Sequence, residues 1–252
     1  MRFPARKDCL ALLKAEGLTA PSVIDVGVLT GTPDLMAAFP DSRHVLIEPE
    51  PAHRGAIAQA YSGLRHTLVE AAASDQEGEA VLVAHRRGGR EDVTHSHVQA
   101  GPADADAPAS GRPVRLARLD TLVDEAGAQA PFVLKIDTDG HEREVLAGAA
   151  DTLKRSAVVI VEATPNTLSG RLAACEAAGL RLFDLVDLAY YHGVLSQADL
   201  VLVNPAVFDP PALSPWMSKT FSWDAWSPHE PLADRLKARA RQLAGRLLGR
   251  RG

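Results

Sequence analysis

The stretch that decides the fold is Ser22-Val-Ile-Asp-Val-Gly-Val-Leu-Thr-Gly31. Its apolar residues are typical of a buried parallel strand, and the carboxylate of Asp25 lies near the end of that strand. Gly27 and Gly31 allow the chain to turn sharply and allow a ligand to approach bare backbone. We therefore predict a strand over residues 22–27 that leads into a ligand-binding turn.

A second apolar run that ends in an acid follows at Val45-Leu-Ile-Glu48. The segment 32–39 between the two runs is long enough for two helical turns, so the unit is predicted to be βαβ. Glu48 then lies at the carboxyl end of the neighbouring strand, where an acid accepts the hydroxyls of a ribose. The unit therefore predicts a site for a cofactor that contains a nucleoside.

The spacing Asp-x-Gly-x-x-x-Gly differs from the G-x-G-x-x-G pattern of dinucleotide sites. A dinucleotide places its pyrophosphate against the helix N-terminus, and Asp25 would repel that group. A zwitterionic ligand suits the loop better, and S-adenosylmethionine carries an amino group, a sulfonium and a carboxylate. Two alternatives stay open: an ordinary βα turn, and an NAD-dependent oxidoreductase whose ribose would suit Glu48 equally.

The composition is that of a soluble globular protein. The 252 residues include 46% hydrophobic residues and carry a net charge of -5, which argues against disorder. No apolar run approaches the roughly 20 residues of a membrane helix, and the first residues lack the apolar core of a secretory signal. Cys9 and Cys175 lack metal-ligand spacing, so we expect a reduced, cytoplasmic chain.

Strands and helices alternate along the chain, which predicts an α/β fold with a parallel, doubly wound sheet. Residues 1–21 are expected to form a capping helix, and residues 22–205 the cofactor-binding domain. Segment 86–113 has no apolar period and is predicted to be a long flexible loop or lid. The further expected elements are strands at 65–72, 78–84, 132–137, 157–162, 181–188 and 199–203, and helices at 52–62, 142–155 and 168–178.

Residues 206–252 are predicted to form a Pro- and Trp-rich wrap followed by a basic amphipathic helix. The segment 232–252 holds seven Arg or Lys residues against one Asp. Three roles stay open for this tail: a solvated helix, a weak peripheral contact with an anionic membrane, and a homodimer contact. The remainder of the chain is acidic, so no nucleic-acid partner is expected.

Four of the predicted strand ends carry a carboxylate. They are Asp25, Glu48, Asp137 and Glu162. In an open α/β sheet the ligand lies outside the carboxyl ends of the strands. Four acids at one rim repel one another unless a cation, hydrogen-bond donors or a positively charged ligand compensate them. This clustering is the main physical evidence for a site, although any one of these acids alone would also serve as a helix N-cap.

Most of the chemistry lies in Asp137-Thr-Asp-Gly-His-Glu142. Asp137, Asp139 and His141 are the candidate catalytic residues, because they gather at a strand end just before a helix. A histidine, with an ordinary pKa of about 6.5, suits taking a proton from an alcohol as a methyl group transfers. Alternatively, Asp137 and Glu162 hold a divalent cation such as Mg²⁺, or His141 is a solvent-facing residue at a helix start.

The stretch Val133-Leu-Lys-Ile-Asp-Thr-Asp-Gly-His-Glu-Arg-Glu-Val-Leu-Ala-Gly148 resembles the FkbM family of S-adenosylmethionine-dependent O-methyltransferases. The family pattern there is a hydrophobic strand, Lys-Ile-Asp, a spacer that ends in an acid, Gly, a variable residue, Glu, and then Val-Leu-x-Gly. Leu119-Asp-Thr-Leu122 and Glu70-Ala-Ala-Ala-Ser-Asp75 are also similar to that family. The resemblance extends from about residue 23 to residue 203.

The resemblance implies a class I methyltransferase fold, which is a Rossmann-like sheet of seven strands with the last one antiparallel. It also implies S-adenosylmethionine as the cofactor and a hydroxyl on a sugar or other natural-product scaffold as the acceptor. The implied cofactor contacts are Asp25, Gly27, Gly31, Glu48, Pro49, Ala72, Ser74 and Asp75. The chain departs from the family at Asp139 and His141, where Glu and a small residue are common, and in the glycine loop. A catalytically silent relative that binds a nucleoside therefore stays an alternative.

Overall fold

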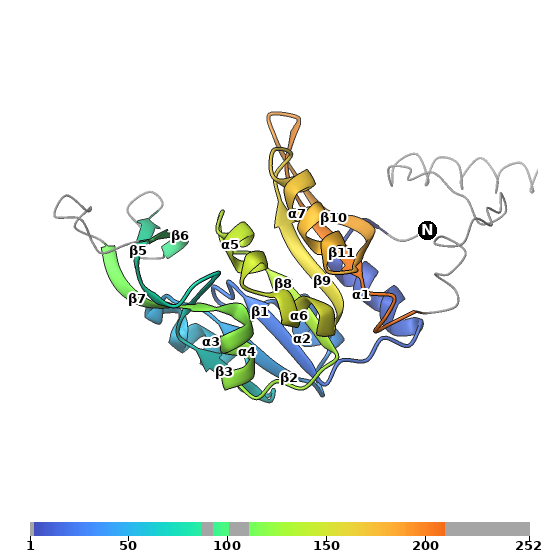
Figure 1. Cartoon of the computed structure of the whole chain (residues 1–252), viewed down its shortest axis with the longest axis horizontal. Coiled ribbons are helices and arrows are strands. Elements are labelled where there is room, and N and C mark those ends of the chain that lie inside the picture. The colour runs from blue at the N-terminus through green and yellow to red at the C-terminus, as the bar shows by residue number, and fades with distance from the viewer. Residues whose placement is uncertain (1–2, 87–92, 101–110, 210–252) are drawn as a thin grey trace, which may run out of the picture.

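A central sheet of seven strands organises the protein, and its strand order is β10-β11-β9-β8-β1-β2-β3 (Figure 1). The computed structural model describes residues 3–86, 93–100 and 111–209. Strand β11 pairs antiparallel with both β9 and β10, whereas the other neighbours pair parallel. The predicted fold class, with an antiparallel last strand, is confirmed. The strands are β1 (Ser22–Val26), β2 (Arg43–Ile47), β3 (His66–Val69), β8 (Phe132–Ile136), β9 (Ser156–Ala163), β10 (Arg181–Tyr191) and β11 (Val194–Val203).

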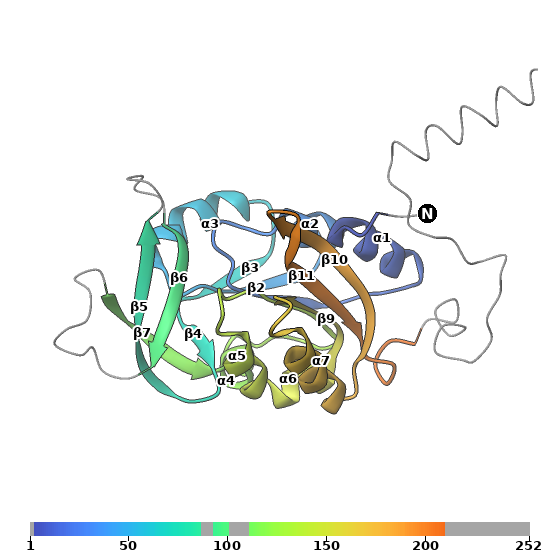
Figure 2. The same ribbon diagram turned by 90° about the horizontal axis from the view of Figure 1, so that it is seen from above.

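Helices cover both faces of this sheet, which is seen edge-on in Figure 2. One layer contains α1 (Arg6–Ala15), α2 (Pro33–Ala38) and α3 (Arg54–Ala60), the last of which follows a short 3₁₀ turn at Pro51–His53. The other layer contains α4 (Leu119–Glu125), α5 (Glu142–Ala147), α6 (Ala150–Arg155) and α7 (Leu168–Ala177). Because both faces are covered, β1 and β8 are buried along their whole length, and this explains their continuous apolar runs.

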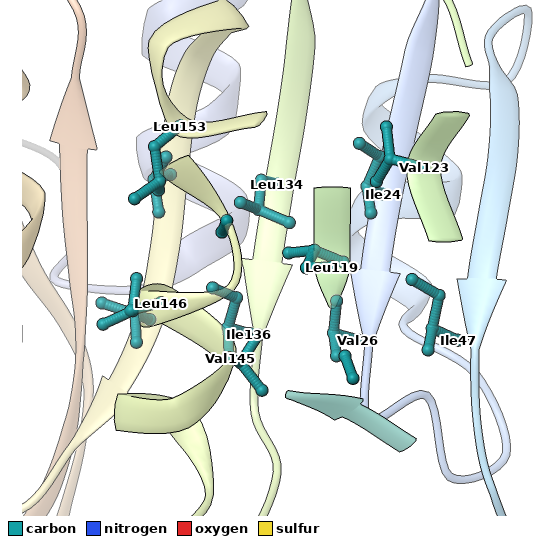
Figure 3. Close-up of a cluster of buried hydrophobic side chains, with 14 of the residues drawn as sticks. Ile24, Val26, Ile47, Leu119, Val123, Leu134, Ile136, Val145, Leu146 and Leu153 are labelled. Carbon is teal, nitrogen blue, oxygen red and sulfur yellow. The ribbon is translucent and has the colours of Figure 1, made fainter. Parts of the chain in front are cut away.

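The core between the sheet and the second helical layer follows the alternation of the strands (Figure 3). Val26 of β1 and Ile136 of β8 point toward this layer, where Leu119 of α4 and Val145 of α5 pack. The intervening strand residues face the opposite layer and pack against α1 and α2. Packing on both faces holds the parallel strands in place, so that their carboxyl ends lie together at one edge of the sheet. The candidate site lies at that edge.

A second sheet of four strands, in the order β4-β7-β5-β6, corrects two expectations. It contains β4 (Ala72–Ser74), β5 (Gly78–Arg86), β6 (Val93–Ala100) and β7 (Gly111–Arg118). The strand expected at 65–72 therefore ends at Val69, and Ala72 starts a strand of the other sheet. The expected loop at 86–113 contains β6 and the start of β7, while residues 87–92 and 101–110 lie outside the described part. Strand β6 is an edge strand, which needs only backbone pairing and so carries no apolar run.

The helix expected at 142–155 is divided into α5 and α6 around Gly148. A Cβ atom at Gly148 would lie 1.7 Å from the carbonyl oxygen of Ser74, so the backbone of β4 packs directly on this point. At this break, β4 of the second sheet therefore packs against the helical layer that covers the first sheet. Strand β11 begins at Val194, earlier than the expected 199, and β10 extends to Tyr191 rather than 188.

A helix, α1, lies within the expected capping segment 1–21, and it packs on the sheet through Cys9, Leu10 and Leu13. The Pro- and Trp-rich wrap and the basic helix fall almost wholly in residues 210–252, which lie outside the described residues. No helix in the described part of the chain is both long and apolar enough to cross a membrane.

Candidate functional site

A cavity of about 270 Å³ lies at the carboxyl ends of β1, β2, β8 and β9, next to the second sheet. The predicted site residues that line it are Gly27, Glu48, Pro49, Ala72, Asp137, Asp139, His141 and Glu162. The others, Asp25, Gly31, Ser74 and Asp75, do not line it. Sequence reasoning missed several lining residues, among them Leu29, His53, Leu82, Thr138 and Gln197. The prediction that the strand-end acids meet at one rim is borne out for Glu48, Asp137 and Glu162.

The two glycines of the first turn have different surroundings. Gly27 has a φ of 80°, and a Cβ atom there would lie 1.7 Å from the carbonyl oxygen of Asp137. The turn after β1 thus passes directly against the end of β8. Gly31 has a φ of 134°, and a Cβ atom there would lie 3.4 Å from side-chain atoms of Ala60 and Tyr61. Gly31 therefore packs against the α3 region, and its contact with a cofactor stays a prediction.

Glu48 builds the turns on which a cofactor would rest. Its Oε2 atom accepts the backbone N–H of Leu29 at 2.8 Å, and its Oε1 atom accepts that of Glu50 at 2.9 Å. The Nδ1 atom of His53 lies 3.4 Å from Oε1. These contacts hold Leu29 at a φ of 54°. Each carboxylate oxygen has a second lone pair, so the side chain can still accept hydroxyl groups.

Asp25 lies beneath the cavity rather than in its wall. It is fully buried, with Oδ1 3.7 Å from Nζ of Lys135 and Oδ2 3.5 Å from the Tyr61 hydroxyl, which donates to it. Lys135 also donates to Oδ2 of Asp137 at 3.0 Å. Burial lowers the pKa of Lys135, but the charges of Asp25 and Asp137 outweigh it, and the pKa is raised. A charged lysine therefore compensates two of the four acids.

The loop Asp137–Glu142 is organised by Glu142, which is 0% exposed. Its Oε1 atom accepts the backbone N–H groups of Thr138 at 2.9 Å and Gly140 at 3.1 Å. Its Oε2 atom pairs with the guanidinium of Arg171 in α7, which also donates to the carbonyl oxygen of Glu162. This network positions the loop whose Asp137 and Asp139 line the cavity. Glu142 matches the Glu of the family pattern, and this match is the sequence signal that would have identified Glu142 as a site residue.

His141 lies at the start of α5, with its ring in the cavity wall. Its Nε2 atom is 3.1 Å from the Ser74 hydroxyl, and Ser74 in turn donates to Asp75 at 3.2 Å. Burial lowers the pKa of His141, against the opposing charges of Glu144 and Asp75. The ring is therefore neutral at neutral pH. Ser74 and Asp75 do not line the cavity themselves, but they are linked to this ring by these two hydrogen bonds.

Glu162 of β9 and Gln197 of β11 form the wall of the cavity next to Asp137. Gln197 donates its side-chain N–H to Oε1 of Glu162. Burial raises the pKa of Glu162 to about 8, and the charges of Asp137, Glu142 and Asp199 and a hydrogen bond with Asp137 add to this effect. The carboxyl group of Glu162 therefore keeps its proton at neutral pH.

This arrangement does not fit a divalent cation, which is the alternative role given above to Asp137 and Glu162. Among the residues that the structure describes, no group of three or more His, Cys, Asp and Glu side chains is placed to hold a metal ion. The ammonium of Lys135 already lies 3.0 Å from Asp137. Lys135 therefore occupies the side of Asp137 where a cation would bind.

Comparison with solved structures found several methyltransferases. The chain is similar to methyltransferase FkbM from Methylobacillus flagellatus (14% identity, 73% of this chain and 43% of that chain, TM-score 0.46). It is also similar to precorrin-6y C5,15-methyltransferase from Geobacter metallireducens (13% identity, 81% and 93%, TM-score 0.41). A third is magnesium protoporphyrin IX methyltransferase from Synechocystis with bound S-adenosylmethionine (11% identity, 78% and 76%, TM-score 0.44). The chain thus spans less than half the length of the first of these proteins.

A family model described as the methyltransferase FkbM domain matches residues 25–182. No curated protein was found to be similar in sequence. The matched segment is more than half of the chain, and it runs from Asp25 in β1 through the Asp137–Glu142 loop to the start of β10. The chain therefore belongs to the FkbM family of methyltransferases.

Proposed function

We propose that this protein transfers a methyl group from S-adenosylmethionine to a hydroxyl oxygen of a sugar or other natural-product acceptor. Membership of the family supports methyl transfer. The observation that carries the finer proposal is that Glu48 and His141 line the same cavity. One is suited to the ribose of the cofactor, and the other to the hydroxyl of the acceptor.

The lining of the cavity suits each part of S-adenosylmethionine. Glu48, with Pro49 and His53 beside it, offers hydrogen-bond acceptors to ribose hydroxyls at the end of β2. Ala72 and Leu82 provide an apolar wall that suits an adenine ring. The carboxylates of Asp137 and Asp139 suit a ligand that carries a sulfonium and an amino group.

The proposed chemistry is a direct displacement. When bound, S-adenosylmethionine supplies the methyl carbon, which leaves sulfur as its bond to the acceptor oxygen forms, with S-adenosylhomocysteine as the leaving group. The hydroxyl proton passes to a ring nitrogen of His141, which burial keeps neutral and able to accept it. The walls of the cavity hold the two reactants in line, and this positioning supplies much of the acceleration.

Cofactor binding is tested by calorimetric titration with S-adenosylhomocysteine, run beside NAD. We expect the wild-type protein to bind S-adenosylhomocysteine and not NAD. Glu48→Gln keeps the shape of the side chain but removes the charge that accepts the hydroxyls, so its affinity should fall by about tenfold. Binding of NAD, or an unchanged affinity in Glu48→Gln, would contradict the proposed cofactor site.

The role of His141 as the base that takes the hydroxyl proton is tested by methyl transfer to a panel of pyranosides and other alcohols. The product is detected by mass spectrometry. His141→Ala should lower turnover by about 10²- to 10⁴-fold and leave the affinity for S-adenosylhomocysteine unchanged. A base must be neutral, so wild-type turnover should decline only below pH ~6.5, where His141 with its lowered pKa gains a proton. That acidic limb should be absent from the residual activity of His141→Ala. A variant with full turnover would contradict the role, and binding without any turnover would favour the silent relative.

A further inference from the structure

A row of three acids crosses the carboxyl end of the central sheet. Asp199 of β11 is paired in register with Glu162 of β9, so the two side chains lie on the same face of the sheet. Glu162 in turn forms a hydrogen bond with Asp137, which follows the neighbouring strand β8. Asp137 and Glu162 line the cavity, whereas Asp199 does not. Asp199 therefore extends the acids of the site away from the cavity and toward β10.

Arg6 is the cation that faces Asp199. It is the first residue of α1, and its Nη1 atom donates to Oδ2 of Asp199 at 2.8 Å. Both side chains are largely buried, with exposed fractions of 16% and 9%. Arg6 also donates from Nη2 to Asp34 at 3.3 Å, and its backbone N–H donates to Oδ1 of Asp187 at 3.0 Å. Acids from α2, β10 and β11 thus converge on Arg6, and in Figure 2 α1 lies beside α2 and β10.

Lys135 is a second cation that acts on Asp199. Its ammonium lies 3.0 Å from Oδ2 of Asp137 and 3.7 Å from Oδ1 of Asp25. Burial raises the pKa of Asp199, and the charges of Arg6 and Lys135 oppose that rise. Arg6 contacts Asp199 directly, whereas Lys135 acts on it from the site. While Arg6 compensates Asp199, Lys135 stays with Asp25 and Asp137.

We propose that Arg6 is a positioning residue of the site: by compensating Asp199, it keeps Lys135 on Asp25 and Asp137. The inference rests on the proposed cofactor site, in which the carboxylate of Asp137 faces the cofactor. A buried carboxylate that loses its partner is strongly unfavourable, so it attracts another cation. Without Arg6, the cation that acts on Asp199 is Lys135. A shift of Lys135 toward Asp199 would leave Asp25 uncompensated and would release Asp137 from its hydrogen bond.

The pair of Arg6 and Asp199 lies outside residues 25–182, the segment that the family model matches. The Lys-Ile-Asp of the family pattern supplies Lys135 and Asp137, whereas α1 and β11 supply the pair that sets the charge beside them. The motif of the matched segment therefore does not specify this pair. In this chain the helix that covers the edge of the sheet also acts on the cofactor site.

The test is calorimetric titration of the full chain with S-adenosylhomocysteine at neutral pH. Arg6→Gln removes the charge but keeps a hydrogen-bonding side chain, and its affinity should fall by about tenfold. Adding Asp199→Asn removes the acid that attracts Lys135. The double variant Arg6→Gln/Asp199→Asn should therefore return to within about threefold of the wild-type affinity. Arg6→Lys keeps the charge and should retain most of the affinity.

Leu13→Ala is the matched control for the packing of α1. Leu13 lies in the same helix, is 0% exposed and packs on the sheet, and its truncation leaves every charge in place. This variant should be less stable in urea, yet it should bind S-adenosylhomocysteine like the wild type where it is folded. A purely structural role of Arg6 would not produce rescue by Asp199→Asn together with normal binding in Leu13→Ala.

The outcomes separate the inference from the function on which it rests. An Arg6→Gln variant that binds S-adenosylhomocysteine like the wild type overturns the inference alone. So does a double variant that binds as weakly as Arg6→Gln, or an equal loss in Leu13→Ala, because Arg6 would then act only through the packing of α1. If Arg6→Gln does not fold, the double variant decides, and failure of the double variant to bind overturns the inference. A wild type that does not bind S-adenosylhomocysteine overturns the proposed function and this inference with it.

Discussion

Replacing Glu142 by alanine is expected to destabilise the protein by about 3–5 kcal/mol and to abolish binding of S-adenosylhomocysteine. Glu142 is 0% exposed, and its carboxylate faces the buried guanidinium of Arg171. Its removal leaves that charge uncompensated and leaves the N–H groups of Thr138 and Gly140 without their acceptor. The loop that presents Asp137 would then lose its shape. Urea denaturation measures the loss of stability, and calorimetry measures the loss of binding.

Two further variants separate this effect from ordinary damage to a helix. Asp151→Ala removes an acid from the neighbouring helix α6, where the side chain is 75% exposed, and should cost less than about 1 kcal/mol. Glu142→Gln keeps one acceptor for the loop N–H groups but removes the charge that Arg171 faces, so its cost should be intermediate. If Glu142→Ala costs as little as Asp151→Ala, the loop is held by other contacts.

The central sheet was predictable because both of its faces are covered. Strands β1, β8 and β9 are nearly continuous apolar runs, which two-sided burial requires, and their ends are marked by acids. The second sheet lacked this signal. Strand β6 lies at an edge of that sheet, and β4 is only three residues long, so neither needs an apolar pattern that the sequence would reveal.

The acids of the site were predictable, but the groups that control them were not. Parallel strands bring their carboxyl ends to one edge, so the prediction for Glu48 and Asp137 followed from topology. Lys135 is hidden in an apolar run, and it meets Asp25 only through the register of β1 and β8. Arg171 and Gln197 come from distant parts of the chain. Asp25 itself lies under the cavity because residues alternate along β1, and the side chain points to the layer of α3.

The close approach of two turns makes Gly27 a second position of large expected effect. Gly27 has a φ of 80°, and a Cβ atom there would lie 1.7 Å from the carbonyl oxygen of Asp137. Gly179 is the matched control, since its φ of 94° is similar but no atom lies within 4 Å of its Cβ position. Gly179→Ala should therefore show only the backbone cost of about 1–2 kcal/mol. Gly27→Ala should cost roughly 3 kcal/mol or more, because a backbone must move as well.

The movement forced by Gly27→Ala has a direction that the structure specifies. The carbonyl of Asp137 must shift away from the turn after β1, and both residues line the cavity. The variant should therefore bind S-adenosylhomocysteine at least tenfold more weakly than Gly179→Ala, in a calorimetric titration under conditions where both variants are folded. Equal stabilities and equal affinities in the two variants would mean that the turns can separate without cost. The contact of Gly27 with Asp137 would then be incidental to the site. A selective loss in Gly27→Ala would instead show that the first glycine of the motif is required by the neighbouring strand end, before any ligand is bound.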